Sequence, residues 1–209
     1  MEKLLARGAE AELVLKDWNE LIVLIKIRVP KKYRHPELDR QLRKTRTKSE
    51  AEIIHRVKEC GVPTPLLYQV DPENAVIVME YIEGDRVRDV VDRLSDEERR
   101  SLFHKIGSYA GILHREGVIH GDLTTSNIII NGERIVFIDF GLSEVSTEVE
   151  KRGVDLNLMN RMLTSTHYRY QDSLLEAFKE GYREKNPEAE EALQRMEEVA
   201  RRGRYIEKN

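Results

Sequence analysis

The sequence predicts an α+β protein with two lobes, an antiparallel sheet carrying one main helix and then a smaller, mostly helical part. Short β-rich runs surround one helical stretch before Glu83, and after Ser95 the apolar residues recur at helical spacing. The length of 209 residues lies between one and two domains of roughly 150 residues each. With 40% hydrophobic and 35% charged residues, the chain is expected to fold. We place the lobes at residues 1–82 and 83–209.

The first lobe is predicted to contain four strands and one helix. The strands are the β-rich runs at residues 13–15, 21–27, 66–70 and 75–79. Asp17 and Asn19 supply turn chemistry between the first two runs, which indicates a hairpin. The helix covers residues 43–59, where apolar residues recur every three positions, and Gly61 ends it. An antiparallel sheet with one helix packed on it follows from this order.

The second lobe is predicted to be mostly helical. Ser95 and Glu98 form a capping box, and the helix that they begin keeps its apolar residues on one face until Gly117. A hairpin is expected around Asn131 and Gly132. Three further helices are expected at residues 154–165, 173–184 and 187–202.

The net charge of −3 conceals a basic stretch at residues 26–48. It carries ten cations against Glu37 and Asp39, a local net of +8. The cations are Lys26, Arg28, Lys31, Lys32, Arg34, Arg40, Arg43, Lys44, Arg46 and Lys48. Because clustered cations displace counterions from phosphate, the stretch is a candidate RNA surface, with a solvated face as the alternative. Residues 201–204, with three arginines, predict a short basic tail that buries little.

Several classes of protein are excluded by what the sequence lacks. The single cysteine, Cys60, excludes a disulfide framework and a zinc site built on paired cysteines. The six histidines show no repeated ligand spacing, so we expect no catalytic transition metal. No apolar run approaches the roughly 18 residues of a membrane span, and no signal-peptide core opens the chain. We therefore expect a cytoplasmic protein that does not enter a membrane.

The chemistry is concentrated in two segments, residues 120–127 and 138–141. Asn127 and Asp139 supply an amide and a carboxylate oxygen, which are suitable ligands for Mg²⁺ beside the phosphates of a nucleotide. Asp122 lies five residues before Asn127 and would accept a hydroxyl proton or orient a water. One carboxylate would thus position the nucleophile while the other holds the metal.

The order and spacing of these segments match the signature set of the protein-kinase-like fold, and that set predicts upstream parts. Lys26, on a predicted strand, would neutralise phosphate oxygens of ATP, and Glu50 on the helix would pair with it. Glu52 is a weaker partner because it faces elsewhere on the helix. Residues 78–82 resemble the hinge to which adenine binds, so Glu80 and Ile82 are candidate ATP contacts. We expect a minimal bilobal protein-kinase-like fold that binds ATP and Mg²⁺.

Departures from the ordinary kinase pattern indicate an atypical member. The glycine-rich phosphate loop is absent, and its place is taken by Gly8, Ala9, Glu10 and Ala11. A carboxylate there would repel phosphates unless it binds metal or pairs with a cation. Gly121 replaces the arginine that reads a phosphorylated activation loop. Only fifteen residues separate Asp139 from Asp155, too few for a peptide-docking activation segment.

Seven segments together resemble the small atypical kinase subunit of the KEOPS (EKC) complex, the PRPK-like family in its archaeal form. They are residues 8–11, 33–36, 46–51, 120–127, 138–143, 153–156 and 202–204. The resemblance spans nearly the whole chain. It implies ATPase and Ser/Thr autophosphorylation activity in support of threonylcarbamoyl modification of the adenosine next to the anticodon in tRNA.

The resemblance also implies partners and residue roles. The second lobe would bind the threonylcarbamoyl-transferase subunit, the first lobe a second small subunit, and tRNA would meet residues 26–48 and 201–204. By position, Asp122 would be the catalytic base, and Asn127 and Asp139 would hold Mg²⁺. Lys26 and Glu50 would orient the phosphates, with Gly8, Ala9, Glu10 and Ala11 as their cover.

Two other functions stay open from the sequence. A small-molecule phosphotransferase shares the His-Gly-Asp loop, although only 54 residues follow Asp155 to form a substrate-binding lobe. A nucleotide-binding scaffold without turnover would not need the complete set of charged site residues. ATP chemistry does not explain residues 33–36 or Arg46. They either pack the first lobe or shape the site or an RNA path.

Overall fold

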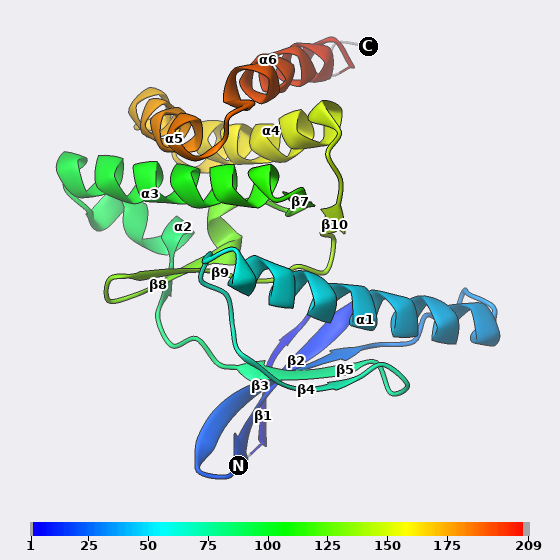
Figure 1. Ribbon diagram of the computed structural model, residues 1–209. Coiled ribbons are helices and arrows are strands. Elements are labelled where there is room, and N and C mark those ends of the chain that lie inside the picture. Colours follow the sequence, from blue (N-terminus) through cyan, green and yellow to red (C-terminus); the bar gives the residue numbers. More distant parts are fainter. Residues whose placement is uncertain (1, 207–209) are drawn as a thin grey trace.

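The computed structural model describes residues 2–206, with side chains as far as Arg202. The first part of the chain forms a five-stranded antiparallel sheet with the order β1-β2-β3-β5-β4 (Figure 1). The strands are β1 (Glu2–Arg7), β2 (Ala11–Trp18), β3 (Leu21–Arg28), β4 (Leu67–Asp71) and β5 (Val76–Glu80). Four of them confirm the predicted runs. The strand β1 was not predicted, because all six of its residues are exposed and no alternating apolar pattern marks it.

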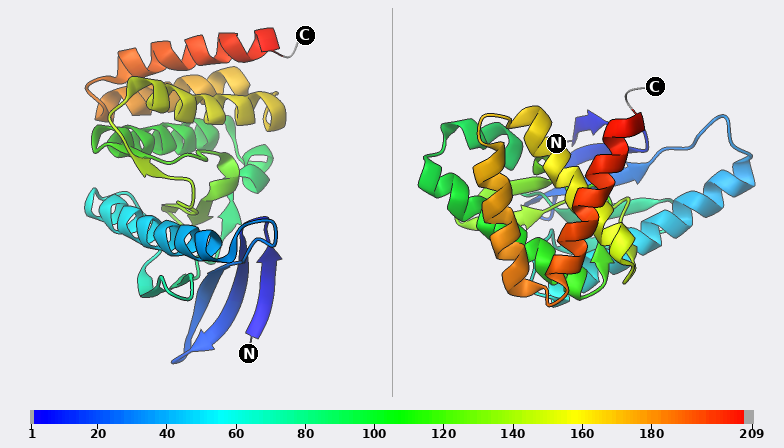
Figure 2. Two further views of the ribbon diagram at one scale, coloured as in Figure 1. Left: turned by 90° about the vertical axis from the view of Figure 1, so that its right-hand side faces the viewer. Right: turned by 90° about the horizontal axis from the view of Figure 1, so that it is seen from above.

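The long helix α1 (Pro36–Glu59) begins earlier than the expected residue 43. Its first turns carry Pro36 and the acidic residues Glu37 and Asp39, which favour a helix start without any apolar periodicity. This end of α1, with the loop before it, projects from the body of the molecule (Figure 2). The other end buries Ile53, Ile54 and Val57. The helix therefore reaches from the sheet to the second part of the chain.

The second part is a stack of helices. They are α3 (Asp96–Arg115), α4 (Val149–Thr166), α5 (Gln171–Lys185) and α6 (Ala189–Ile206). The helix α3 packs along α5 and α4 along α6 (Figure 1). The capping box at Ser95 is confirmed, since the Glu98 amide donates to Ser95 Oγ and the Ser95 amide to Glu98 Oε2. Because α6 continues to Ile206, residues 201–204 are part of a helix and not the short tail that was expected.

Short elements connect the sheet to the helices. They are β6 (Asp85–Arg86), α2 (Val87–Val90), the 3-10 turns η1 (Val91–Arg93) and η2 (Thr125–Asn127), β7 (Val118–Ile119), β8 (Ile128–Asn131), β9 (Arg134–Phe137) and β10 (Glu144–Val145). The strands β8 and β9 form the expected hairpin at Gly132. Within the described residues, no helix has both the length and the hydropathy that a membrane crossing needs.

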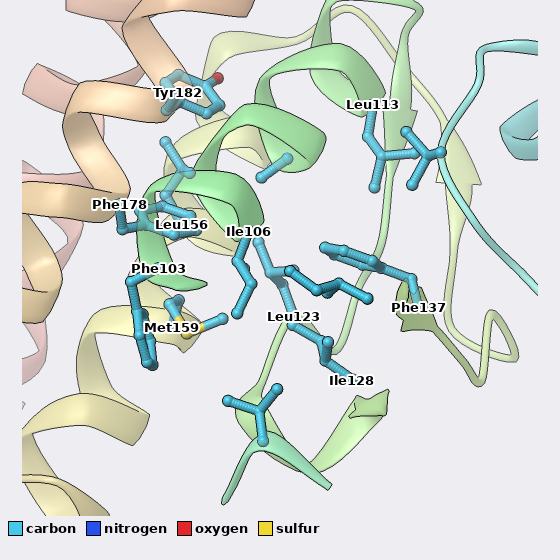
Figure 3. Close-up of a cluster of buried hydrophobic side chains, with 14 of the residues drawn as sticks. Phe103, Ile106, Leu113, Leu123, Ile128, Phe137, Leu156, Met159, Phe178 and Tyr182 are labelled. Carbon is cyan, nitrogen blue, oxygen red and sulfur yellow. The ribbon is translucent and has the colours of Figure 1, made fainter. Parts of the chain in front are cut away.

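One apolar core joins the helices to the connecting elements. Phe103, Phe137, Phe178 and Tyr182 are fully buried in it, and α3, β9 and α5 supply them (Figure 3). Ile54 of α1 belongs to the same cluster, so the two parts of the chain share a core. The position of the lobe boundary, between residues 82 and 83, stays a prediction.

Candidate active site

Lys26 lies at the centre of the charged site between the sheet and the helices. Its Nζ is 2.7 Å from Glu50 Oε1 and 2.8 Å from Asp139 Oδ1. Burial alone would lower the pKa of the Lys26 ammonium, but the Glu50 and Asp139 carboxylates outweigh it and raise that pKa. Lys26 is therefore a cation at neutral pH. The predicted contact between Lys26 and Glu50 is present, whereas Glu52 faces away and contacts Lys48.

Arg28 is a second buried cation in this site, which the sequence analysis did not single out. Because side chains of a strand alternate, Arg28 lies on the same face of β3 as Lys26. Its Nη2 is 2.6 Å from Glu50 Oε2, so Glu50 binds both cations with its two oxygens. Because Arg28 follows Lys26 by two positions on a predicted strand, the sequence could have indicated that both side chains face the site.

Asp139 reaches Lys26 from an unusual backbone conformation. Its φ is +61°, a value rare for residues other than glycine, and the Gly141 amide donates to its Oδ1 over 3.3 Å. Burial raises the pKa of Asp139, but the adjacent Lys26 outweighs it and lowers the pKa. Gly141 keeps this corner open, because a Cβ there would lie 3.1 Å from Asp139 Oδ1 and 3.3 Å from Lys26 Nζ.

The loop from His120 to Asn127 holds the predicted catalytic residues together. Asn127 Nδ2 donates to Asp122 Oδ2 over 2.7 Å and to the Asp122 carbonyl over 3.0 Å. The Asp122 amide donates to Nδ1 of the buried His120. Burial lowers the pKa of His120, which favours the neutral ring. Since Nδ1 accepts from the Asp122 amide, a neutral His120 carries its proton on Nε2. Asp122 and Asn127 are thus brought together as the motif predicts.

Asp155 of α4 holds this loop through hydrogen bonds to its backbone. Its carboxylate accepts from the amides of His120 (2.8 Å) and Gly121 (3.0 Å) and contacts His114 Nε2 (3.1 Å). His114 Nδ1 in turn lies 2.9 Å from the hydroxyl of Tyr182. These contacts anchor the loop of residues 120–127 to α3, α4 and α5. Neither His114 nor Tyr182 was singled out, since no local motif connects them.

Gly121 is explained by close packing. Its φ is +80°, and a Cβ at this position would lie 2.2 Å from the carbonyl oxygen of Leu142. No other residue fits there without moving the segment after Asp139. The glycine that replaces the usual arginine is therefore a requirement of how these two loops approach each other.

A cavity of about 140 Å³ lies on one side of Lys26. Apolar side chains from both parts of the chain line it, together with Glu80, Ile82, Asn127 and Asp139. The Glu80 amide donates to the Leu66 carbonyl, so Glu80 is engaged in the sheet. In residues 2–206 no backbone hydrogen bond uses the N–H of Ile82, which leaves it available to a ligand. The apolar side chains that line the cavity with Ile82 suit an adenine ring.

A second cavity of about 300 Å³ lies on the other side of Lys26, under the loop between β1 and β2. All four predicted cover residues, Gly8, Ala9, Glu10 and Ala11, line it with Lys26 and Asp139. Arg28 lines it as well. Lys26 and Asp139 line both cavities, and each cavity has apolar as well as charged side chains in its wall.

The donor groups fit Mg²⁺ when phosphate oxygens and water complete its coordination. Both hydrogen bonds of the Asn127 side chain use Nδ2, which leaves Oδ1 as a ligand. Asp139 is half exposed and offers a carboxylate beside it in the first cavity. Magnesium prefers such oxygen ligands and keeps several waters, so two protein ligands suffice. In the described residues no cluster of three or more acidic, histidine or cysteine side chains forms a closed metal cage.

The basic stretch of residues 26–48 is not a row of free cations. In the described chain, every cation of this stretch except Lys31 and Lys32 contacts a carboxylate. Several of those carboxylates lie outside the stretch, among them Glu10, Glu73 and Asp139. The local net of +8 counted along the sequence is therefore largely offset in three dimensions.

Comparison with known proteins identifies relatives over the whole length. The RIO-domain family matches residues 25–154. The chain is 43% identical over 215 residues to the KEOPS complex subunit Bud32 of Pyrococcus abyssi, covering 99% of this chain and 98% of that protein. It is 44% identical over 204 residues to a probable bifunctional tRNA threonylcarbamoyladenosine biosynthesis protein of Methanothermobacter thermautotrophicus. That match covers 98% of this chain but 37% of the longer relative.

Solved structures show the same fold at low identity. WaaP in complex with acyl carrier protein has a TM-score of 0.66 at 17% identity, covering 95% of this chain and 88% of that chain. The Rio2 kinase of Chaetomium thermophilum, solved as an ADP/Mg²⁺-phosphoaspartate complex, has a TM-score of 0.64 at 17% identity, covering 92% and 69%. The fold class expected from the sequence is confirmed, as is the resemblance to a family: the chain belongs to the RIO-domain family, in its branch of archaeal Bud32 (PRPK-like) proteins.

Proposed function

We propose that this chain is an ATP-dependent phosphotransferase of the atypical Ser/Thr kinase type, with ATPase activity. The observation that carries the proposal is Lys26. It contacts Glu50 and Asp139, and it lines both cavities. The first cavity would take the adenine ring of ATP, and the ammonium of Lys26 would bind the phosphates. Membership of the RIO-domain family supports the same activity.

The site residues would divide the work as follows. Adenine would lie in the first cavity and hydrogen-bond to backbone of Glu80 and Ile82, while Lys26, held by Glu50, would bind phosphate oxygens. Asn127 and Asp139 would hold Mg²⁺, which when bound neutralises phosphate charge. Asp122 would accept the proton of the attacking hydroxyl or water, and Asn127 Nδ2 fixes the orientation of its carboxylate.

We further propose that the chain acts within the KEOPS complex and supports threonylcarbamoyladenosine modification of tRNA. The names of the two sequence relatives support this role. In the bifunctional relative the matching segment is part of a longer protein, which supports a partner that corresponds to the remainder. That partner would be the threonylcarbamoyl-transferase subunit, bound by residues 83–209. A second small subunit would bind residues 1–82, and the complex would work in the cytoplasm.

tRNA would approach the basic stretch and the end of α6. Exposed ion pairs such as Arg40 with Glu37 are weak in water, so their cations can exchange a carboxylate for a phosphate. Lys32, which is exposed, needs no such exchange. Arg201 and Arg202 are exposed on the last turns of α6, whereas the side chain of Arg204 lies outside the described residues.

The test of the proposed activity is ATP turnover by Asp122→Ala. We expect kcat to fall by about 10² to 10⁴, the usual contribution of a positioned base, with the affinity for MgATP changed only a few-fold. Radiolabelled ATP is incubated with the purified chain, with and without tRNA and the transferase subunit. Asp172→Ala, which removes an exposed aspartate of α5, is the control.

Each other result points to another function. Undiminished turnover in Asp122→Ala would refute the role of this aspartate. Rapid phosphorylation of a free sugar or aminoglycoside, without any response to tRNA or the transferase subunit, would indicate a small-molecule phosphotransferase. Tight nucleotide binding without turnover in the wild-type chain and its complex would indicate a scaffold.

A further inference from the structure

The loop between β1 and β2 carries a negative charge where nucleotide phosphates are proposed to bind. Glu10 lines the cavity of about 300 Å³ under this loop together with Lys26, Arg28 and Asp139. A carboxylate in that position repels phosphate oxygens if its charge is not balanced. The loop has no run of glycines through which backbone amides would compensate. Some other group has to neutralise Glu10 when a triphosphate is bound.

Arg46 of α1 is that group. Its Nη1 lies 2.7 Å from both carboxylate oxygens of Glu10, while Arg28 Nη1 is farther away, at 3.7 Å. The hydrogen bond from Arg46 is the largest cause of a lowered pKa at Glu10, against the opposing effect of burial. Arg28 is already bound to Glu50 at 2.6 Å. Arg46 is therefore the main counter-charge of Glu10.

The same ion pair fixes the loop in place over the cavity. Backbone hydrogen bonds hold the turn itself, from the Gly8 amide to Ala11 and from the Val29 amide to Glu10. The Arg46 side chain adds a contact from the loop to α1, the helix that also carries Glu50. Arg46 is not among the residues that line the cavity under this loop. It lines a cavity of about 240 Å³ with Glu50, Gly141 and Leu142. Since Arg46 lies outside the cavity under the loop, its effect on a nucleotide would pass through Glu10.

We propose that Arg46 is a positioning residue for nucleotide binding, which acts by neutralising Glu10 and holding the β1–β2 loop over the phosphates. The inference rests on the ATP binding proposed above. It assigns a function to Arg46, which ATP chemistry alone leaves unexplained. It also gives the reason why a loop with a carboxylate can replace a glycine-rich one: an arginine on the neighbouring helix cancels the charge.

The experiment is a double-mutant cycle measured by calorimetric titration of the whole chain with MgATP and with adenosine. The variants are Arg46→Ala, Glu10→Gln and the double variant, with Arg161→Ala as a control that removes an exposed arginine from α4. Arg46→Ala should weaken MgATP binding about tenfold, because an unpaired carboxylate then faces the phosphates. Glu10→Gln and the double variant should bind MgATP at least as tightly as the wild type.

Two further readouts separate electrostatics from folding. Adenosine has no phosphates, so its affinity should be the same in all variants. The defect of Arg46→Ala should shrink as salt is raised, because the repulsion is screened. Arg161→Ala should match the wild type with both ligands.

The inference is overturned if Arg46→Ala binds MgATP within twofold of the wild type. It is also overturned if the double variant binds MgATP no more tightly than Arg46→Ala alone. A loss of binding in Glu10→Gln alone would also overturn it, since Glu10 would then act as a metal ligand. Equal weakening of adenosine binding in Arg46→Ala would overturn it too, since the loss would then not depend on the phosphates. A wild-type chain that binds no MgATP would refute the proposed function as well, which distinguishes the two failures.

Discussion

Replacing Asp155 by asparagine removes one of the two buried carboxylate oxygens that accept hydrogen bonds from the loop of residues 120–127. Asp155 Oδ2 binds the His120 amide and His114 Nε2, and Oδ1 binds the Gly121 amide. Asparagine keeps a single acceptor oxygen, so its NH₂ group must face at least one of these donors. A lost hydrogen bond to a charged group costs about 1.5–3 kcal/mol, and an unsatisfied buried donor about 1–3 kcal/mol. We therefore expect Asp155→Asn to lower the free energy of unfolding by about 3 kcal/mol or more.

Two assays check this expectation. Urea unfolding at pH 7 gives the stability loss, with Asp172→Asn on the surface of α5 as the control. ATP turnover should fall at least about tenfold, because the displaced Gly121 amide precedes Asp122 and small errors of position are costly to a general base. A variant whose stability stays within about 0.5 kcal/mol of the wild type would refute the reasoning, since that is the range of surface substitutions.

The way the free energy of unfolding depends on pH tests the same contacts of the Asp155 carboxylate. Burial raises the pKa of Asp155, but the hydrogen bond and charge of His114, with the hydrogen bond from the His120 amide, outweigh it and lower that pKa. A lowered native pKa stabilises the fold above the unfolded value of about 3.9, and this stabilisation is lost as the pH falls through the native pKa. The stability difference between the wild type and Asp155→Asn should therefore be full at pH 7 and shrink below about pH 4.

Two more predictions concern the site and the helix stack. Lys26→Met should lower ATP turnover about a hundredfold or more. It should reduce the free energy of unfolding by less than about 2 kcal/mol, because Arg28 still pairs with Glu50. Turnover within threefold of the wild type would contradict this prediction. Gly181→Ala should cost about 3 kcal/mol or more in urea unfolding, because its Cβ would lie 1.9 Å from the carbonyl oxygen of His104. Gly132→Ala, with open space around it, is the control at about 1 kcal/mol, and equal losses in both would refute the packing argument.

Most of the secondary structure was predictable because it depends on neighbours in the chain. The capping box at Ser95 and the hairpin at Gly132 are local signals, and both were found where expected. The expected helix at residues 43–59 was right in its end but not in its start, since the first turns of α1 bury only Asp39 and show no apolar period. The strand β1 has no pattern of its own, and pairing with β2 alone makes it a strand.

The candidate site was predictable as a set of residues but not as a set of contacts. The order of the motifs marked Lys26, Glu50 and Asp139, which are far apart along the chain. The fold brings Lys26 Nζ to 2.7 Å from Glu50 Oε1 and 2.8 Å from Asp139 Oδ1. Their catalytic and metal-binding roles remain proposals. The sequence left open whether Arg46 packs the first lobe or shapes the site or an RNA path. Its contact with Glu10 favours a role in shaping the site, and no pattern in the sequence predicts that contact.

The α+β class, the order of most elements and a set of candidate site residues follow from the sequence alone, because hydrophobic period, turn residues and short motifs act over a few positions. The three-dimensional fold was needed to show which charges meet. Glu50 binds two cations, Arg46 neutralises Glu10, and Asp155 joins three helices to the catalytic loop through His114 and Tyr182. Such contacts link residues that are distant along the chain, and they depend on where packing of the shared core places each strand and helix.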